Sequence, residues 1–325
     1  MPRLRDLPTR ICRRPGPVPG RVRTRFRATA VRPAVAALLC GTVLAGCAGP
    51  PERGPERDRS ASSAPSPVPD PLWDRSPSSL AAVGDSITRG YDACGLLADC
   101  PEVSWATGSD PAVDSLAVRL LGAKGAAARS WNLARSGARM AELPAQMERA
   151  AARKPALVTV MAGANDACRS STAAMTPVAE FRTGFAEALR RLRATAPTAQ
   201  VYVASVPDLK RLWSEGRENP VGKQVWKLGL CASMLGDADD LGPAAERRRA
   251  LVDARVRAYN AALREVCAAD ERCRYDDGAV FAYRFTGEQL SPWDWFHPGR
   301  DGQGRLAALA HRIVTDARPA PPGRR

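Results

Sequence analysis

Residues 156–166 read ALVTVMAGAND, and the order of apolar and polar residues in this stretch decides the fold class. The first six residues form a nearly continuous apolar run, which is typical of a short strand buried on both faces of a sheet. Asn165 and Asp166 follow within a few residues, after Gly163 has opened space at the strand end. Because ligands bind beyond the carboxyl ends of parallel strands, the stretch predicts a parallel sheet with functional groups at that edge.

Outward from this stretch, short apolar runs alternate with longer segments of helical spacing. Strands are expected at residues 79–83, 130–133, 156–161, 201–205 and 274–281. Helices are expected at residues 113–121, 139–153, 178–195, 244–268 and 305–317. This alternation predicts an α/β fold in which helices cover both faces of a mostly parallel sheet.

Residues 207–243 interrupt the alternation. The segment contains Gly and Pro and carries Trp213 and Trp226, so we expect an irregular or partly helical excursion beside the site. Long ordered loops are often functional, which makes the segment a candidate wall of a substrate pocket. A packed insertion without contact to substrate is the equally weighted alternative.

A candidate serine nucleophile follows the first expected strand, in Gly84-Asp85-Ser86. Gly84 permits a tight turn, and Ser86 can begin a helix whose N–H groups face the reacting centre. The triplet alone is a weak signal, because a serine after Gly-Asp often only caps a helix. A serine nucleophile also needs a base.

Only two histidines in the sequence can supply that base. His311 lies in the last expected helix and is expected at the surface or at the helix end. His297 lies in SPWDWFHP, at residues 291–298, three residues after Asp294. A loop can fold this spacing so that the carboxylate meets one imidazole nitrogen and the other nitrogen faces the serine. A loop histidine satisfied by a local acid is the alternative.

Two further strand ends offer donors for an oxyanion hole. Asn165 presents an uncharged amide after the strand at 156–161. Gly137, in LARSGA at residues 133–138, can present its backbone N–H without a side chain in the way. Each residue taken alone is ordinary in a loop of this kind.

Together these residues resemble the four sequence blocks of the SGNH (GDSL) hydrolases, in the same order and at similar spacing: Gly84-Asp85-Ser86, Gly137, Gly163-x-Asn165-Asp166 and Asp294-x-x-His297. The resemblance covers about residues 79–315. It implies a flavodoxin-like, three-layer α/β/α sandwich with a mostly parallel sheet of about five strands. It also implies hydrolysis of esters or thioesters with no cofactor and no metal.

The resemblance implies a role for each residue. Ser86 would be the nucleophile, His297 the base and Asp294 the acid that orients the base. The N–H groups of Ser86 and Gly137 and the side chain of Asn165 would hold the oxyanion. In some members a backbone carbonyl replaces the acid, which leaves an alternative for Asp294.

The expected activity is that of an esterase or lipase acting through an acyl-enzyme. Because this fold hosts several hydrolases, a phospholipase or a carbohydrate O-deacetylase is the alternative among enzymes. A non-catalytic cell-surface binding protein is the alternative outside enzymes. The expected partner is an ester substrate, lipid esters included, and the protein is expected to be a monomer.

The N-terminus predicts export. Residues 1–46 combine ten arginines and one acid with an apolar run that leads into LAGC, ending at Cys47. This pattern is typical of a lipoprotein signal peptide, whose cysteine is lipid-modified. An ordinary signal peptide and an internal translation start are the alternatives. We expect a protein anchored at the extracellular face of a bacterial membrane, or a secreted one.

The remaining chain divides by composition. Residues 47–78 are rich in Pro, Ser and charged side chains and are expected to form a disordered tether. Residues 79–317 are expected to form the hydrolase domain, and 318–325 a disordered tail. Much of the formal net charge of +14 lies in residues 1–46, and later arginines mix with acids, so no nucleic-acid partner is expected.

Nine cysteines are present, of which Cys12 and Cys40 would leave with the signal peptide and Cys47 would carry lipid. The other six predict disulfides in an exported domain but leave the connectivity open. No pair has C-x-x-C spacing, so a zinc site is not supported. The cysteines are similar to those of the disulfide-containing secreted esterase and lipase branch of the family. On that resemblance we expect the pairs Cys94–Cys100, Cys168–Cys231 and Cys267–Cys273.

Overall fold

A computed structural model describes residues 72–317. The expected signal peptide, Cys47 and the tail at 318–325 lie outside the described residues. Five strands form one parallel sheet: β1 (Leu80–Gly84), β2 (Ser130–Asn132), β3 (Leu157–Met161), β4 (Gln200–Val203) and β5 (Cys273–Tyr275). Their spatial order is β2-β1-β3-β4-β5. β1 and β3 pair along their whole length, with Gly84 beside Met161, so both strands end at the same edge.

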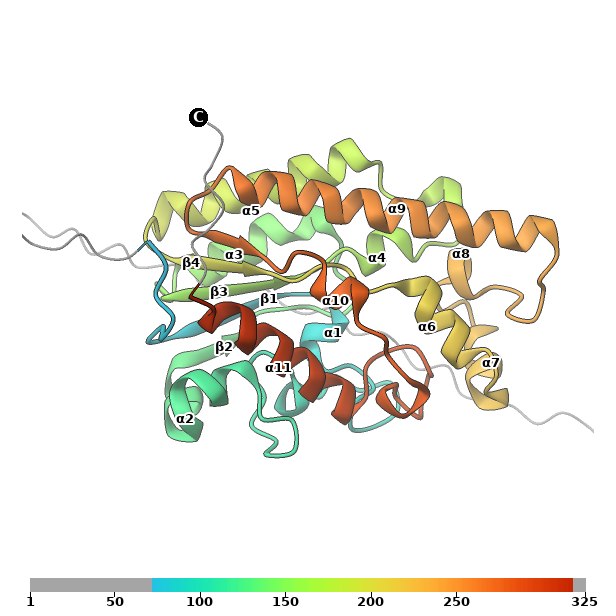
Figure 1. The fold of residues 1–325 in the computed structure, drawn as a ribbon, viewed down its shortest axis with the longest axis horizontal. Coiled ribbons are helices and arrows are strands. Elements are labelled where there is room, and N and C mark those ends of the chain that lie inside the picture. Colours follow the sequence, from blue (N-terminus) through green and yellow to red (C-terminus); the bar gives the residue numbers. More distant parts are fainter. Residues whose placement is uncertain (1–71, 318–325) are drawn as a thin grey trace, which may run out of the picture. The chain divides into compact units, whose positions relative to one another are not determined.

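Helices connect the strands and cover both faces of the sheet. They are α1 (Ser86–Arg89), α2 (Leu116–Arg129), α3 (Leu143–Ala151), α4 (Ala164–Ala167), α5 (Val178–Thr195), α6 (Leu209–Gly216), α7 (Pro220–Trp226), α8 (Ala232–Leu235), α9 (Pro243–Ala268), α10 (Ala279–Ala282) and α11 (Arg300–Thr315). Short 3₁₀ turns occupy Pro101–Val103, Met140–Glu142, Thr172–Ala174 and Gly287–Gln289. In Figure 1, α3, α5 and α9 lie along one face of the sheet, and α2 and α11 lie along the other.

The predicted three-layer α/β/α fold is confirmed by this arrangement. β1 and β3 are completely buried, as their unbroken apolar runs indicated. α5 has the predicted bounds. α2 begins at Leu116, later than predicted, because the side chain of Ser115 accepts the N–H of Val118 and caps the helix there.

The last strand is shorter than the expected 274–281. β5 ends at Tyr275, and the carboxylate of Asp276 accepts the N–H groups of Gly278 and Val280 at 2.9 and 3.0 Å. These bonds turn the chain into α10, so the second half of the apolar run is helical.

The end of the expected tether packs on the domain, which corrects the boundary placed at residue 78. The indole N–H of Trp73 donates to the carbonyl of Val314 at 2.9 Å, and Arg274 stacks on the same ring. The side chain of Gln200 in β4 bonds both backbone groups of Asp74, at 2.8 and 3.0 Å. The average composition of 47–78 concealed this single aromatic anchor.

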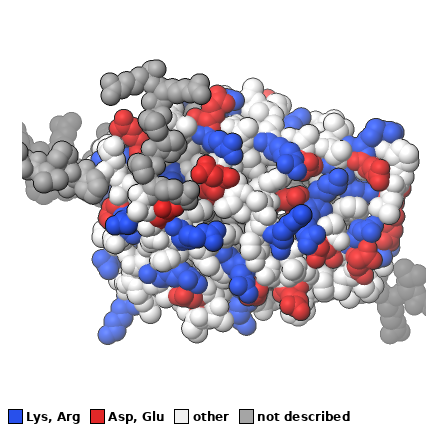
Figure 2. Space-filling model, in the orientation of Figure 1, with Lys and Arg blue, Asp and Glu red and all other residues white. Residues whose placement is uncertain are grey.

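Charges of both signs cover the surface. On the face in Figure 2, acidic side chains lie among the basic ones across the described part of the molecule. Within residues 72–317, no helix combines the length and apolar character that a membrane crossing requires.

Candidate active site

Ser86 lies where the central strand β1 passes into α1. Gly84 has a φ of 142°, and a Cβ there would lie 2.1 Å from the carbonyl oxygen of Met161 in β3. Only glycine allows this approach of two strand ends. Asp85 then caps α1 by accepting the N–H of Ile87 at 3.0 Å. The turn places Ser86 as the first residue of α1, at the carboxyl edge of the sheet.

The structure brings Ser86, His297 and Asp294 together in the expected order. The Oγ of Ser86 lies 2.9 Å from Nε2 of His297, and Nδ1 of the same ring lies 2.5 Å from Oδ2 of Asp294. The other carboxylate oxygen accepts the backbone N–H groups of Phe296 and His297 at 2.9 and 3.0 Å. All three side chains are buried, so the hydrogen-bonded chain is largely shielded from water.

Electrostatics within this chain favour a charged imidazole. Burial lowers the pKa of His297, but the negative charge of Asp294 and its hydrogen bond outweigh burial, and the pKa is raised. Burial raises the pKa of Asp294, but the charge and hydrogen bonds of His297 outweigh burial, and the pKa is lowered. The carboxylate therefore stabilises the imidazolium that forms when the ring accepts a proton.

The loop that carries His297 is fixed by its neighbours. Trp226 in α7 donates its indole N–H to the carbonyl of Asp294 at 2.8 Å. The carbonyl of His297 accepts the N–H of Ser291 at 2.8 Å. Trp295 has a left-handed φ of 54° that bends the chain between the acid and the histidine. These contacts hold the ring in one orientation.

The expected oxyanion donors lie on two neighbouring loops. Asn165, in α4, borders the same cavity as Ser86. Its amide donates to the carbonyl of Ala138 at 3.1 Å, directly after Gly137, and a side-chain amide carries two N–H groups. Gly137 is exposed, with a left-handed φ of 77°. The bond to Ala138 therefore links the loop of Asn165 to the loop of Gly137.

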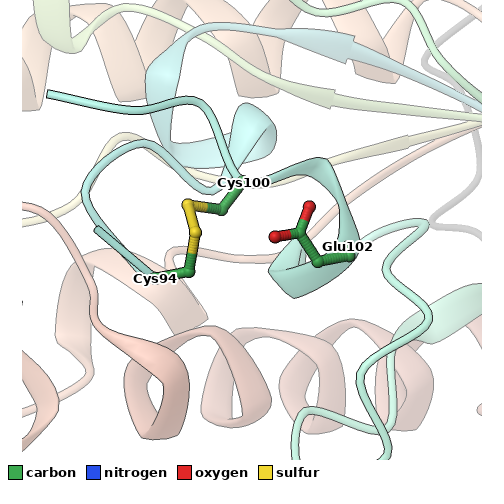
Figure 3. A group of neighbouring side chains, drawn as sticks. All are labelled: Cys94, Cys100 and Glu102. Carbon is green, nitrogen blue, oxygen red and sulfur yellow. A yellow bond between two sulfur atoms is a disulfide. The ribbon is translucent and has the colours of Figure 1, made fainter. Parts of the chain in front are cut away.

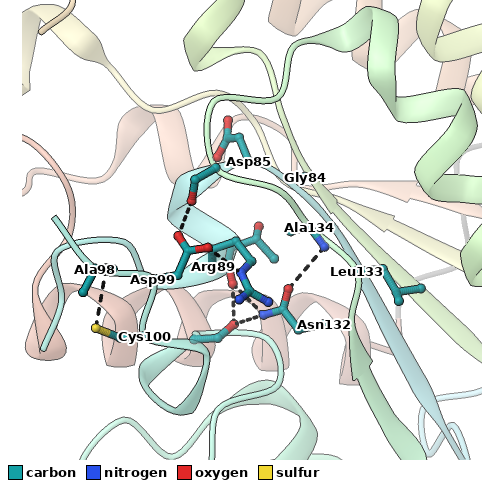
Figure 4. A network of polar contacts seen from close by, with 12 residues as sticks. Gly84, Asp85, Arg89, Ala98, Asp99, Cys100, Asn132, Leu133 and Ala134 are labelled. Atoms are coloured by element: carbon teal, nitrogen blue, oxygen red, sulfur yellow. Dashed lines mark hydrogen bonds and ion pairs between the residues drawn. The ribbon is translucent and has the colours of Figure 1, made fainter. Parts of the chain in front are cut away.

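Polar contacts through Asp99 join the loop of Gly137 to α1 (Figure 4). Arg89, in α1, donates to one oxygen of Asp99 at 3.1 Å. Ser136, next to Gly137, donates to the other oxygen of Asp99. The helix that begins with Ser86 and the loop that carries Gly137 are thus joined through a single carboxylate.

A cavity of about 80 Å³ opens beside Ser86 and His297. Its apolar lining comes mainly from Ile87, Leu209, Leu212, Leu230 and Phe296. All three leucines belong to residues 207–243, so this segment forms part of the cavity wall, as expected.

The sequence profile of the GDSL-like lipase/acylhydrolase family matches residues 82–305, which is more than half of the chain. The chain belongs to this family. The match includes Ser86, Gly137, Asn165, Asp294 and His297, so all of the expected catalytic and oxyanion residues of this GDSL-family protein fall within it. No curated protein matches the sequence.

Several solved structures are similar to this chain at low sequence identity. An extracellular lipase from Streptomyces rimosus is 18% identical, with 74% of this chain and 100% of the lipase covered and a TM-score of 0.43. A phospholipase A1 from Streptomyces albidoflavus is 19% identical, with 74% and 100% covered and a TM-score of 0.40. A family two carbohydrate esterase from Clostridium thermocellum is 16% identical, with 73% and 63% covered and a TM-score of 0.41.

The structure pairs six cysteines of this GDSL-family domain in the way the resemblance implied: Cys94–Cys100, Cys168–Cys231 and Cys267–Cys273. The first pair lies beside Glu102 (Figure 3), and the three side chains place potential metal ligands within 4.8 Å of one another. The two sulfurs are bonded to each other, whereas cysteine binds metals as a thiolate. This group therefore does not offer a thiolate site.

The Cys168–Cys231 disulfide joins two sides of the cavity. Cys168 directly follows α4, which contains Asn165, and Cys231 directly precedes α8. Ser233 adds a hydrogen bond from its hydroxyl to the carbonyl of Ala167 at 2.8 Å. The bridge therefore fixes residues 207–243 against the loop that carries a candidate oxyanion donor.

Replacing both Cys168 and Cys231 with serine is expected to lower kcat by about tenfold at temperatures where the protein stays folded, because a donor displaced by about 1 Å loses much of its effect. The loop closed by this bridge spans 63 residues, and chain entropy predicts a loss of about 4 kcal/mol of stability. Ester turnover and thermal unfolding are measured together.

The matched control removes the Cys267–Cys273 bridge, which closes a loop of 6 residues away from the cavity. It is expected to lower Tm through a loss of about 2 kcal/mol while leaving kcat near the wild-type value. Equal turnover in the two double variants would contradict a positional role for the longer bridge.

Two buried glutamines that fix the site were not predicted as site residues. Gln146, in α3, bonds both backbone groups of Gly84 at 2.8 and 2.9 Å. Gln303, in α11, donates to the carbonyl of Ile87 at 3.0 Å. Gln146 lies on the apolar face of the helix expected at 139–153, which is the signal that could have found it. Gln303 lies before the helix expected at 305–317, because α11 begins at Arg300. His311 is partly exposed in α11, consistent with its expected place.

Proposed function

We propose that this chain is a serine ester hydrolase that works through an acyl-enzyme. The observation that carries the proposal is the continuous hydrogen-bonded chain from Ser86 through His297 to Asp294. Ser86 attacks the ester carbonyl while Nε2 of His297 takes its proton, and the imidazolium then protonates the leaving alcohol. Water, activated by the same ring, attacks the acyl-serine and releases the acid.

The tetrahedral intermediate needs donors for its oxygen. The N–H of Ser86, at the start of α1, the N–H of Gly137 and the side chain of Asn165 are proposed for this role. Preorganised donors of this kind are worth about 10²–10³ in kcat each. The contacts through Asp99 between α1 and the loop of Gly137 support the proposal, because they hold two of the donors in a fixed position relative to each other.

The preferred substrate is proposed to be an ester with a short or medium apolar acyl group. The cavity beside Ser86 is mostly apolar, which suits a hydrocarbon chain, and about 80 Å³ accommodates several water-sized groups. The phospholipase and carbohydrate O-deacetylase activities remain the alternatives.

A panel of substrates tests this choice. p-Nitrophenyl acetate, butyrate and octanoate are expected to outpace p-nitrophenyl palmitate, a phosphatidylcholine vesicle and an acetylated oligosaccharide. Fluorophosphonate labelling, mapped by mass spectrometry, is expected at Ser86. Labelling with turnover only on phospholipid or sugar esters would overturn the acyl preference. The absence of both labelling and turnover would favour a non-catalytic binding protein.

We also propose that the protein is exported and anchored by lipid at Cys47. Three disulfides in the domain support an oxidising compartment. Wild-type protein expressed in a bacterial host that processes lipoproteins is expected in the membrane fraction. Cys47→Ser is expected to block that maturation, because the thiol is the acceptor of the lipid. Wild-type protein found free in the medium and cleaved beyond Ala48 would contradict the anchor.

A further inference from the structure

A second aspartate lies buried beside the proposed catalytic chain. Asp92 is 1% exposed and follows α1 by two turn residues. Its φ is 56°, a left-handed conformation that aspartate and asparagine tolerate better than most side chains. The preceding Tyr91 packs edge-on against the ring of His297, with centroids 5.2 Å apart. The chain after α1 therefore passes along the ring of His297 and leads directly to Asp92.

Backbone contacts fix Asp92 between two loops. Its N–H donates to the carbonyl of Ala98, inside the Cys94–Cys100 disulfide loop, at 2.9 Å. Its carbonyl accepts the hydroxyl of Ser291, at the start of the loop that carries His297, at 2.6 Å. The backbone position of Asp92 is thus set by two loops of the fold.

The carboxyl group itself faces the acid and the base. An oxygen of Asp92, an oxygen of Asp294 and a ring nitrogen of His297 all lie within 4.8 Å of one another. Oδ1 of Asp92 has no hydrogen-bond partner among residues 72–317, although it is buried. A buried carboxyl oxygen without a partner is costly, so its presence beside the proposed base calls for an explanation.

The charged and titratable groups around this cluster are few. Asp294 and Tyr91 face Asp92, Asp85 acts on His297 from the start of α1, and Asp99 acts on Tyr91. Burial and then the charge of Asp294 raise the pKa of Asp92 to about 6, while His297 opposes them. Near neutral pH, Asp92 therefore carries a negative charge, and one of its oxygens lies within 4.8 Å of a ring nitrogen of His297.

We propose that Asp92 is a positioning residue of this site: a second carboxylate that acts on His297 alongside Asp294 and stabilises the imidazolium formed during acyl transfer. The inference rests on the proposed function, in which His297 is the base. Two carboxylates strengthen the base more than one, because each adds an attraction to the protonated ring. Below the pKa of Asp92 the neutral carboxyl can donate to Asp294, and the attraction is lost.

The sign of the pH effect follows from this charge. With Asp92 ionised, His297 holds its proton to a higher pH, so the acid limb of kcat/KM lies at a higher pH. Removing the charge is expected to lower the pKa of His297 and move that limb down by about one pH unit. It is also expected to lower kcat at pH 8 by about tenfold, because the imidazolium in the transition state is less stabilised.

Asp92→Asn tests the proposal, because asparagine keeps the shape and the left-handed backbone but removes the charge. Asp277→Asn is the matched control, since Asp277 is also an aspartate with a left-handed φ, 53°, but is exposed beside β5. The chain has only two histidines, so ¹⁵N-histidine NMR with a His311→Gln variant assigns the His297 ring directly.

A fall of about one unit in the His297 pKa in Asp92→Asn, with no change in Asp277→Asn, is the expected result. An unchanged His297 pKa and an unchanged acid limb would overturn the proposal. If Asp92→Asn does not fold, the wild-type protein still decides: its His297 signals are expected to report a second ionisation near pH 6, and a single-step titration would refute it. If the His297 pKa shifts in Asp92→Asn but the wild-type protein shows no esterase activity, the coupling between Asp92 and His297 stands and the proposed function is rejected.

Discussion

Replacing Ser86 with alanine is expected to lower kcat by about a millionfold, which is the usual cost of removing the nucleophile of a catalytic triad. The hydroxyl is the only group removed, and its oxygen lies 2.9 Å from Nε2 of His297. Asp85, which caps α1, and Gly84, which makes the turn, both remain. The fold should therefore be retained, and the measurement is ester turnover with a thermal melt of the same sample.

Ser130→Ala is a suitable control for this experiment. Ser130 begins β2, at the amino edge of the sheet, and its hydroxyl bonds the carbonyl of Ala126 at 2.7 Å. Its removal is expected to leave kcat within about twofold of wild type, because it lies away from the edge where reaction occurs. Wild-type-like turnover by Ser86→Ala would refute the proposed nucleophile.

Asp294→Asn is expected to slow turnover by about 10⁴. Asparagine can keep one oxygen to accept the N–H groups of Phe296 and His297, but its NH₂ group then faces Nδ1 of the ring. Two donors cannot pair, so the imidazole adopts the wrong tautomer and no longer accepts the proton of Ser86. The melting temperature should change little, because the backbone contacts of the loop persist.

The size of the loss separates two readings of this residue. If a backbone carbonyl orients His297, as in some family members, Asp294→Asn should cost under about tenfold. Such a result would remove Asp294 from the triad without affecting the roles of Ser86 and His297. The kinetic constants are measured over a pH range, so that a shifted optimum is not mistaken for a lost mechanism.

The strands at the centre of the sheet could be predicted because they are buried on both faces. β1 and β3 are short and nearly all apolar, and a run of this kind is typical of a strand that is covered by helices on both sides. β5 could be located but not delimited, because apolar residues continue into α10 while the side chain of Asp276 ends the strand. Residues 207–243 were expected to be irregular or partly helical, and they contain α6, α7 and α8.

Site residues were predictable where chemistry limits the choice. The chain has two histidines, so the base for Ser86 had to be chosen from only two candidates. Asp92 could not be found in this way, because an aspartate in a loop is ordinary and its meeting with His297 depends on how the chain leaves α1. The link from Asp99 to Ser136 is equally invisible in the sequence, since a hydrogen bond between two loops has no periodic signature.

Residues 207–242 couple the choice of substrate to the geometry of the proposed catalytic residues. This segment leaves the sheet after β4 and rejoins the layered body at α9, so its length can change without shifting the register of any strand pair. Two of its residues nevertheless reach the site: Trp226 bonds the carbonyl of Asp294, and Cys231 is bonded to Cys168, next to the helix of Asn165. Natural selection, or an engineer grafting a relative's segment, could therefore change which acyl group is accepted only with a segment that keeps the tryptophan and the cysteine.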